Sequence, residues 1–191
     1  MKTTLISLAV IFSLTAFGQT TEDHAKNGTE KQKQQEQKDV ESFVLDWPQN
    51  GNWKVGADQV NEQQRVIDFI HPNETIEKWT ELANMSTVKG VKGVKVDTAM
   101  NFVFEQARLN SPKAKLTFIE KDEIAVYPWI IFTVEAPGFV NDETPESQLW
   151  YIIQGKQSLY TNFIAIKKAT IPADLKEKWT KFFKAGKIVS Q

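Results

Sequence analysis

The feature that most constrains the fold is the second half of the folded region, where four strand-like runs follow one another with no helix-like segment between them. β-Branched and aromatic residues dominate the runs, and Gly155-Lys156-Gln157-Ser158 has the composition of a hairpin turn. Runs of strands with few helices between them favour an antiparallel sheet over a doubly wound parallel one. The predicted strands span residues 115–120, 124–135, 148–154 and 159–168, with Lys121-Asp122-Glu123 as the first turn.

The first half of the folded region adds three shorter strands. The first runs from Ser42 to Trp47 and is closed by the turn Pro48-Gln49-Asn50-Gly51. A short second strand is predicted over residues 53–55, and a third over residues 63–70. Residues 66, 68 and 70 of the third strand share one face, because side chains alternate along a strand.

Three segments show helical spacing instead. Apolar residues at helical spacing around Trp79 predict a helix over residues 74–88. Asp97 is expected to cap a second helix over residues 98–110, and Pro172 to open a third that ends near Ala185. Trp179 lies on the apolar stripe of the third helix. The expected fold is therefore α+β, with a mainly antiparallel β-sheet and helices packed on it.

The N-terminus predicts export. Residues 1–18 combine a positive start at Lys2, an apolar stretch and small residues before Gln19, which is the pattern of a cleavable signal peptide. The stretch is shorter than a bilayer span, although a short anchor or a buried helix is an alternative. Residues 19–39 contain no large apolar side chain and are expected to be a disordered polar linker. Residues 40–191 then form one domain, with no stable membrane insertion after the signal is removed.

The cysteine and charge content exclude some classes of function. The chain has no cysteine, so it offers neither a disulfide nor a lipid attachment site, and its stability must come from core packing. The 23 basic and 24 acidic residues nearly balance, which argues against a nucleic-acid partner. Only Arg65 and Arg108 are arginines, so bidentate anion recognition is not widespread.

No metal or cofactor is expected. Of the two histidines, His24 lies in the linker, so His71 is the only one in the folded region. Metal sites need clustered ligands, which two separate histidines do not supply. The acidic loop Asn141-Asp142-Glu143 lacks the long pattern of a Ca²⁺ loop and is interpreted as solvated surface.

His71 is the candidate for catalysis. It precedes Pro72 at a strand end, and Asp68 or Glu74 is close enough in sequence to orient it. A small hydrolase using these residues is one alternative, and a polar turn residue is the other. No G-x-S-x-G elbow accompanies it.

The loop Gly90-Val91-Lys92-Gly93 lies between the first two predicted helices. A basic G-x-x-G loop resembles the loop with which KH domains clamp a nucleic-acid backbone. The slightly negative net charge and the predicted export argue against that function. The alternative is a lysine-rich connector.

Six tryptophans could build a core or a binding surface. Trp53, Trp129 and Trp150 lie on or beside predicted strands and are the candidates for stacking on a glycan or another small ligand. Trp53 has the most polar neighbours and is the best candidate for exposure. The alternative is that these rings fill the interface between sheet and helices.

Several of these elements together resemble a known family. An extended segment ending in Pro72, the run ETIEKWTELA around Trp79, a strand-rich half, the hairpin at Gly155 and the run PADLKEKWTKFF around Trp179 are similar to the PsbP-like fold. That resemblance would cover about residues 43–188. It implies an α/β/α sandwich around an antiparallel sheet and a docking or accessory role. It implies no catalytic residue and transfers no functional residue to this chain.

The sequence therefore predicts an exported, non-enzymatic binding or accessory domain, in the periplasm more than outside the cell. Its partner is an unknown protein or small molecule. A small hydrolase built on His71 and a glycan-binding module with an aromatic surface remain as alternatives.

Overall fold

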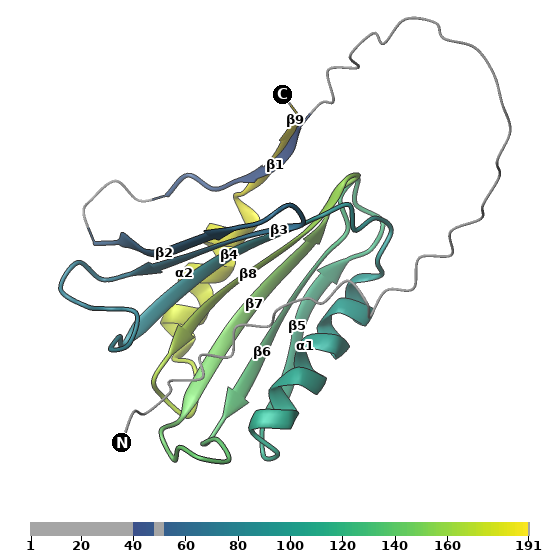
Figure 1. Cartoon of the computed structure of the whole chain (residues 1–191). Coiled ribbons are helices and arrows are strands. Elements are labelled where there is room, and N and C mark those ends of the chain that lie inside the picture. The colour runs from purple at the N-terminus through teal and green to yellow at the C-terminus, as the bar shows by residue number, and fades with distance from the viewer. Residues whose placement is uncertain (1–39, 48–51, 191) are drawn as a thin grey trace, which may run out of the picture.

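The structure is a computed structural model that describes residues 40–47 and 52–190. The predicted signal peptide, the predicted linker and the predicted turn at residues 48–51 lie outside the described residues. The described residues form nine strands and two helices (Figure 1). They are β1 (Glu41–Val44), β2 (Lys54–Val60), β3 (Gln64–Ile70), β4 (Glu81–Lys89), α1 (Val96–Asn110), β5 (Lys115–Asp122), β6 (Trp129–Ala136), β7 (Glu146–Gln154), β8 (Ser158–Ile166), α2 (Ala173–Lys184) and β9 (Lys187–Ser190). Neither of these helices is long and apolar enough to cross a bilayer.

Seven strands form one antiparallel sheet in the order β2-β3-β4-β8-β7-β6-β5. The meander β2-β3-β4 and the meander β5-β6-β7-β8 are joined by pairing of β4 with β8, from Glu81 opposite Ile166 to Lys89 opposite Ser158. β1 and β9, the two ends of the folded region, pair with each other in a separate two-stranded sheet. The predicted α+β class with a mainly antiparallel sheet is confirmed.

The two helices cover opposite faces of the large sheet (Figure 1). α1 lays small residues, such as Ala99 and Ala107, on a core that includes Phe132. α2 packs Trp179 and Phe183 into a second core on the other face. Strand residues alternate between the two cores, and every residue of β7 and β8 is buried. Strands covered on both faces have near-continuous apolar sequences, which is why β7 and β8 carry little polar alternation.

The predicted helix over residues 74–88 is wrong. Residues 71–80 form turns, in which the backbones of Thr75 and Lys78 bond each other, and residues 81–89 form β4. β4 is central in the sheet and buried on both faces, so its apolar residues did not alternate. Pairing with β3 on one edge and β8 on the other satisfies the backbone of β4, and the sheet buries its side chains on both faces. The element order therefore has four strands before the first helix.

Smaller predictions also need correction. α1 begins at Val96 after the N-cap Lys95, and Asp97 is no cap: its carboxylate accepts a hydrogen bond from Lys121 Nζ at 2.6 Å. β5 continues into the predicted turn as far as Asp122, whose carboxylate accepts hydrogen bonds from the backbone amides of Ile124 and Ala125, and β6 starts only at Trp129. The second strand is seven residues long, and β9 was not predicted.

Candidate functional site

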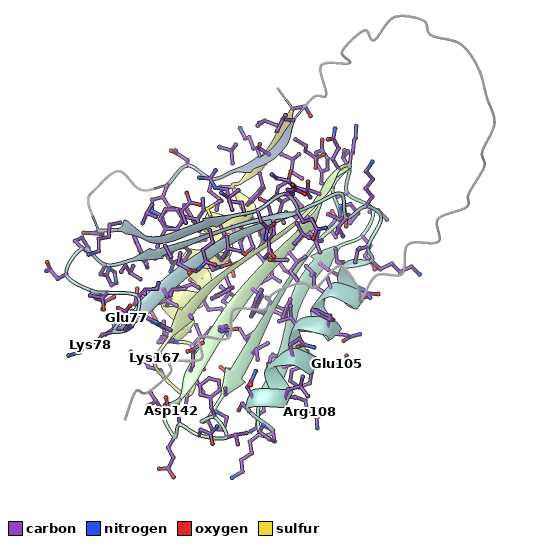
Figure 2. The ribbon with its side chains drawn as sticks, in the orientation of Figure 1. Glu77, Lys78, Glu105, Arg108, Asp142 and Lys167 are labelled. Carbon is purple, nitrogen blue, oxygen red and sulfur yellow. The ribbon has the colours of Figure 1, made fainter. Side chains whose placement is uncertain are left out.

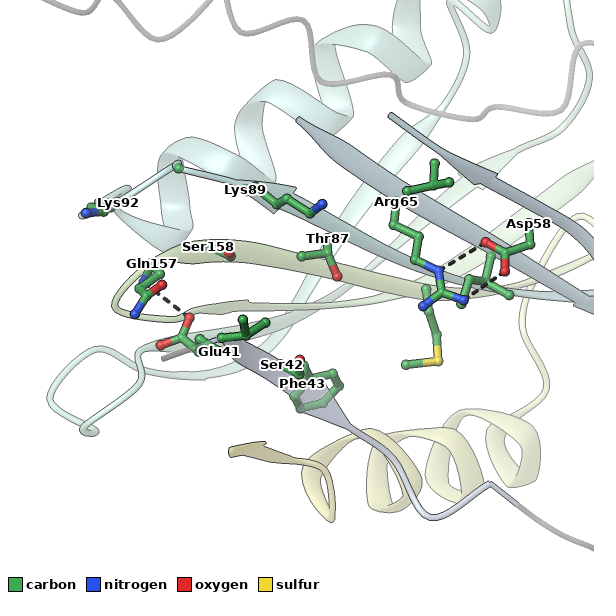
Figure 3. A pocket seen from close by; sticks show the side chains of 15 residues that line it. Glu41, Ser42, Phe43, Asp58, Arg65, Thr87, Lys89, Lys92, Gln157 and Ser158 are labelled. Atoms are coloured by element: carbon green, nitrogen blue, oxygen red, sulfur yellow. Dashed lines mark hydrogen bonds and ion pairs between the residues drawn. The ribbon is translucent and has the colours of Figure 1, made fainter. Parts of the chain in front are cut away.

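The candidate site is a hollow between β1 and the β2-β3-β4 part of the large sheet, on the face that carries α2 (Figure 3). Its volume is about 920 Å³, within the range of small-molecule sites. Residues from β1, β2, β3, β4, the loop after β4 and the β7–β8 turn line it. Segments far apart in sequence thus meet at this one place.

A polar row crosses the wall formed by β3 and β4. Arg65 lies directly opposite Thr87 in the register, and Lys89 follows two residues later on the same face of β4. Lys89 points along this wall towards Thr87 and Arg65 (Figure 3). Among the described residues, none gives the Lys89 ammonium a hydrogen bond or ion pair. The row therefore presents an unpaired cation to the hollow.

An apolar row lies beside the polar one. Ile67 and Met85 are cross-strand neighbours, one step further along β3 and β4. Phe43 of β1 faces them across the hollow, and it packs against Tyr151 and Tyr160 at centroid distances of 5.9 Å. The hollow is therefore amphipathic, with a cationic end and an apolar end.

The carboxylate of Glu41 fixes the β1 wall. Its oxygens accept hydrogen bonds from the backbone amides of Lys156 and Gln157 at 2.8 and 3.2 Å, and from the Tyr160 hydroxyl at 3.2 Å. Burial and the nearby Glu41 carboxylate raise the pKa of Tyr160, so the hydroxyl stays protonated and donates. Glu41 is buried and its oxygens are occupied, so it belongs to the wall and not to the open binding surface.

Arg65 uses only some of its hydrogen-bond donors within the protein. Its Nε and Nη2 atoms donate to the two carboxylate oxygens of Asp58 at 3.1 and 2.8 Å. This bidentate pair lowers the pKa of Asp58 and raises the pKa of Arg65. The pair leaves both N–H groups of Nη1 without a bond among the described residues, and Arg65 lines the hollow.

The predicted catalytic residues are not brought together. His71 Nδ1 lies 2.9 Å from the carbonyl oxygen of Asn52, and His71 Nε2 lies 3.4 Å from Glu81 Oε2. Asp68 lies on the α1 side of the sheet, opposite Asn84, which donates a hydrogen bond to it at 2.7 Å. Burial raises the pKa of Asp68, and the Asn84 bond opposes that shift.

Glu74 is likewise used locally. Its Oε1 accepts hydrogen bonds from the backbone amide and the hydroxyl of Thr80, which closes the turn before β4. Neither Asp68 nor Glu74 has a hydrogen bond to His71, whose two ring nitrogens already have oxygen neighbours. The arrangement holds a turn and does not assemble a nucleophile with a base.

The three candidate tryptophans lie apart from the hollow. Trp150 is 1% exposed and donates a hydrogen bond to Gln148 Oε1 at 2.8 Å, so it is a core residue. Trp129 is half-buried with the Lys184 ammonium 4.8 Å from its ring centre. Trp53 is half-buried between His71, Trp47 and Trp179, and it meets the last two rings edge to face. All six indoles are buried or half-buried, so these rings do not form an open stacking platform.

The glycine loop has a different context from the expected one. Gly90 and Gly93 have positive φ angles of 77° and 65°, and they connect β4 to α1 instead of joining two helices. The described residues include no cluster of three or more potential metal-ligating side chains. Lys92 in this loop lines the edge of the hollow.

Sequence reasoning missed the residues of the hollow. Lys89 lies between the predicted helix over residues 74–88 and the loop that starts at Gly90, and Arg65 stands out in the sequence only as one of two arginines. The proximity of Lys89 and Arg65 depends on the register of β3 with β4, and the position of the β1 wall depends on the pairing of β1 with β9. No local sequence pattern encodes either relationship. The one local signal is the alternation of Arg65, Ile67 and Phe69 along the third predicted strand.

The comparisons with known proteins add no name to this geometry. No protein-family model matches the sequence, and no curated protein matches it.

Proposed function

We propose that this protein is an exported, non-enzymatic binding domain and that the hollow between β1 and the large sheet is its ligand site. The observation that carries the proposal is the unpaired Lys89 ammonium beside an apolar wall that includes Met85, inside a hollow of about 920 Å³. A binding site is typically a concave, mostly apolar surface with a few polar groups that fix orientation. The hollow shares this concavity and has an apolar wall, and its share of polar and charged side chains is larger than in a typical site.

The site geometry favours binding over catalysis. The hydroxyls on the hollow's lining are Ser42, Thr87 and Ser158, and no histidine lines it. A serine or threonine nucleophile needs a base within hydrogen-bonding distance. His71, the histidine among the described residues, has oxygen neighbours at both ring nitrogens. These contacts support a binding role and give the hydrolase alternative no assembled site.

Export to the periplasm is part of the proposal and comes from the sequence of residues 1–18. We include an accessory role of the PsbP-like kind, which the sheet with a helix on each face supports. The absence of a helix around Trp79 removes one of the motifs on which that resemblance relied. Expression in a Gram-negative host tests export: the mature protein should appear in the periplasmic fraction with Gln19 as its first residue. An uncleaved, cytoplasmic product would contradict it.

The ligand site can be tested with the methionines. Met85 lines the hollow, whereas Met100 lies on α1 against the opposite core, and Met1 is in the predicted signal. The exported protein labelled with ¹³C at the methionine methyl groups therefore gives one reporter and one internal control. Hexanoate, 1-hexanol, hexylamine and glucose are titrated one at a time.

The expected result is a saturable shift of the Met85 methyl resonance with at least one probe while Met100 stays fixed. The proposal is overturned if no probe shifts Met85, or if both methyl groups always shift together. It is equally overturned if a broad hydrolase screen finds turnover that the His71→Ala variant lacks.

A further inference from the structure

We infer that the hollow selects small carboxylates with an apolar body, bound through Lys89 and Thr87 at one end and over Met85 at the other. This inference rests on the proposed binding function and names the ligand class for the same site. It follows from the charges that remain unpaired, from the geometry of the donors and from the position of the apolar row.

The unpaired charge at the hollow is positive. Two acidic side chains line it, and both are occupied: Glu41 by three donors and Asp58 by Arg65. Lys89 and Lys92 have no such partner among the described residues. An incoming cation would therefore meet repulsion, whereas an anion would gain a charge-assisted hydrogen bond.

The donors suit a group with two oxygens. Arg65 has used the Nε–Nη2 edge of its guanidinium on Asp58, and the N–H groups of Nη1 remain as donors. The Thr87 hydroxyl lies between Arg65 and Lys89 and supplies a further donor. A carboxylate can accept from these separate donors on its two oxygens. The row therefore suits an anion with two acceptor oxygens.

The apolar row requires the rest of the ligand to be hydrophobic. Ile67 and Met85 lie next to Arg65 and Thr87 along the strands, at the two-residue spacing of one sheet face. Phe43 closes the opposite side, and its position is held by pairing of β1 with β9. A ligand with its carboxylate at Lys89 would lay its body over Met85 and against Phe43. A fully polar anion would leave this surface without a partner.

The test compares matched probes on the exported protein. Hexanoate should bind more tightly than 1-hexanol, and hexylamine should bind weakest, by the Met85 methyl shift. Acetate, which keeps the carboxylate without the body, should bind more weakly than hexanoate. Hexanoate affinity should also fall as salt rises, because the charges at the rim of the hollow are screened.

Two variants and a control locate the carboxylate. Lys89→Gln and Thr87→Val should each weaken hexanoate binding about three- to tenfold, the value of one charge-assisted hydrogen bond at a partly exposed site. Lys78→Gln makes the same charge change at an exposed position that does not line the hollow (Figure 2) and should leave affinity unchanged. The Met100 resonance and the melting temperature confirm that each variant is folded.

The outcomes separate the two proposals. If 1-hexanol binds as well as hexanoate, or Lys89→Gln changes nothing, the carboxylate inference is overturned and the binding function stands. If inorganic phosphate binds more tightly than hexanoate, the ligand class is also overturned. If no probe shifts Met85, the proposed function fails, and this inference fails with it.

Discussion

The carboxylate of Glu41 occupies the space in which a β-carbon at position 155 would stand, so glycine is required there by contact with a side chain from the first strand. The same carboxylate accepts hydrogen bonds from the backbone amides of the two residues that follow Gly155. The backbone amides of the β7–β8 turn thus form a cradle around the Glu41 carboxylate, which belongs to β1 at the start of the folded region. This contact places β1, and with it Phe43, over the hollow.

Gly155→Ala should therefore destabilise the protein by displacing Glu41. We expect a loss of about 1–3 kcal/mol in the free energy of unfolding, because the two amides of the cradle would lose their buried acceptor. Urea denaturation followed by tryptophan fluorescence measures the loss. The matched control is the same substitution in a Glu41→Ala background, where the added methyl group would meet mainly Tyr160. A Gly155→Ala cost that is equal in both backgrounds would contradict the role of Glu41.

Asp68 and Asp58 should respond to pH in opposite senses. Burial raises the pKa of Asp68, so the folded state binds more protons than the unfolded state just above the ordinary pKa, and stability falls as pH rises through that window. Above it, Asp68→Asn should raise the melting temperature. The hydrogen bond to Arg65 lowers the pKa of Asp58, so Asp58→Asn should lower the melting temperature near neutral pH.

Melting curves of both variants at neutral and acidic pH check this pair. The gain from Asp68→Asn should vanish once Asp68 of the wild type is protonated in both states. The loss from Asp58→Asn should vanish at a lower pH, below the depressed pKa of the folded state. A destabilised Asp68→Asn at neutral pH would show that the ionised carboxylate is favoured by its surroundings.

Much of the strand pattern could be predicted from the sequence because turns interrupt it clearly. Gly155-Lys156-Gln157-Ser158 separates two runs that pair in the structure, from Gln154 opposite Leu159 outwards. α2 was predicted close to its observed bounds, because Trp179 and Phe183 lie on one face of an otherwise polar segment. Local composition decides such elements.

β4 shows why other parts could not be predicted. Leu82, Ala83 and Met85 fit a helical stripe, but Ala83 and Met85 face one core and Leu82 the other. A central strand buried on both faces carries no alternation, so its neighbours in the sheet determine its structure. The candidate site has the same difficulty, since the proximity of Lys89 and Arg65 exists only once β3 and β4 are in register.

Iodide should quench the tryptophan fluorescence of the folded protein weakly. Trp79, Trp150 and Trp179 are buried, and the other three indoles are half-buried against neighbouring rings or a lysine. The quenching slope should be several times smaller than that of the same protein unfolded in urea. A folded slope close to the unfolded one would mean that aromatic surfaces are open to solvent, which would restore the glycan-binding alternative.

The ion pair between half-buried Lys167 and buried Glu146 should stabilise the fold only as a pair. Glu146 is 3% exposed. Its carboxylate accepts a hydrogen bond from the Lys167 ammonium at 2.7 Å and another from the side-chain amide of Gln148 at 2.8 Å. The Lys167 ammonium also lies 4.0 Å from the ring centre of Trp79. Lys167→Met alone would leave the Glu146 carboxylate buried without its cation, and we expect a loss of about 3–5 kcal/mol.

The double variant Lys167→Met with Glu146→Gln should recover a large part of that loss, because a neutral amide is far less costly to bury than an unpaired carboxylate. Urea denaturation of the wild type, both single variants and the double variant gives the coupling energy directly. Lys181→Met removes one side of an exposed pair with Glu177 and should change stability by less than about 1 kcal/mol. If the Lys167 and Lys181 variants lose the same stability, burial does not decide the strength of these pairs.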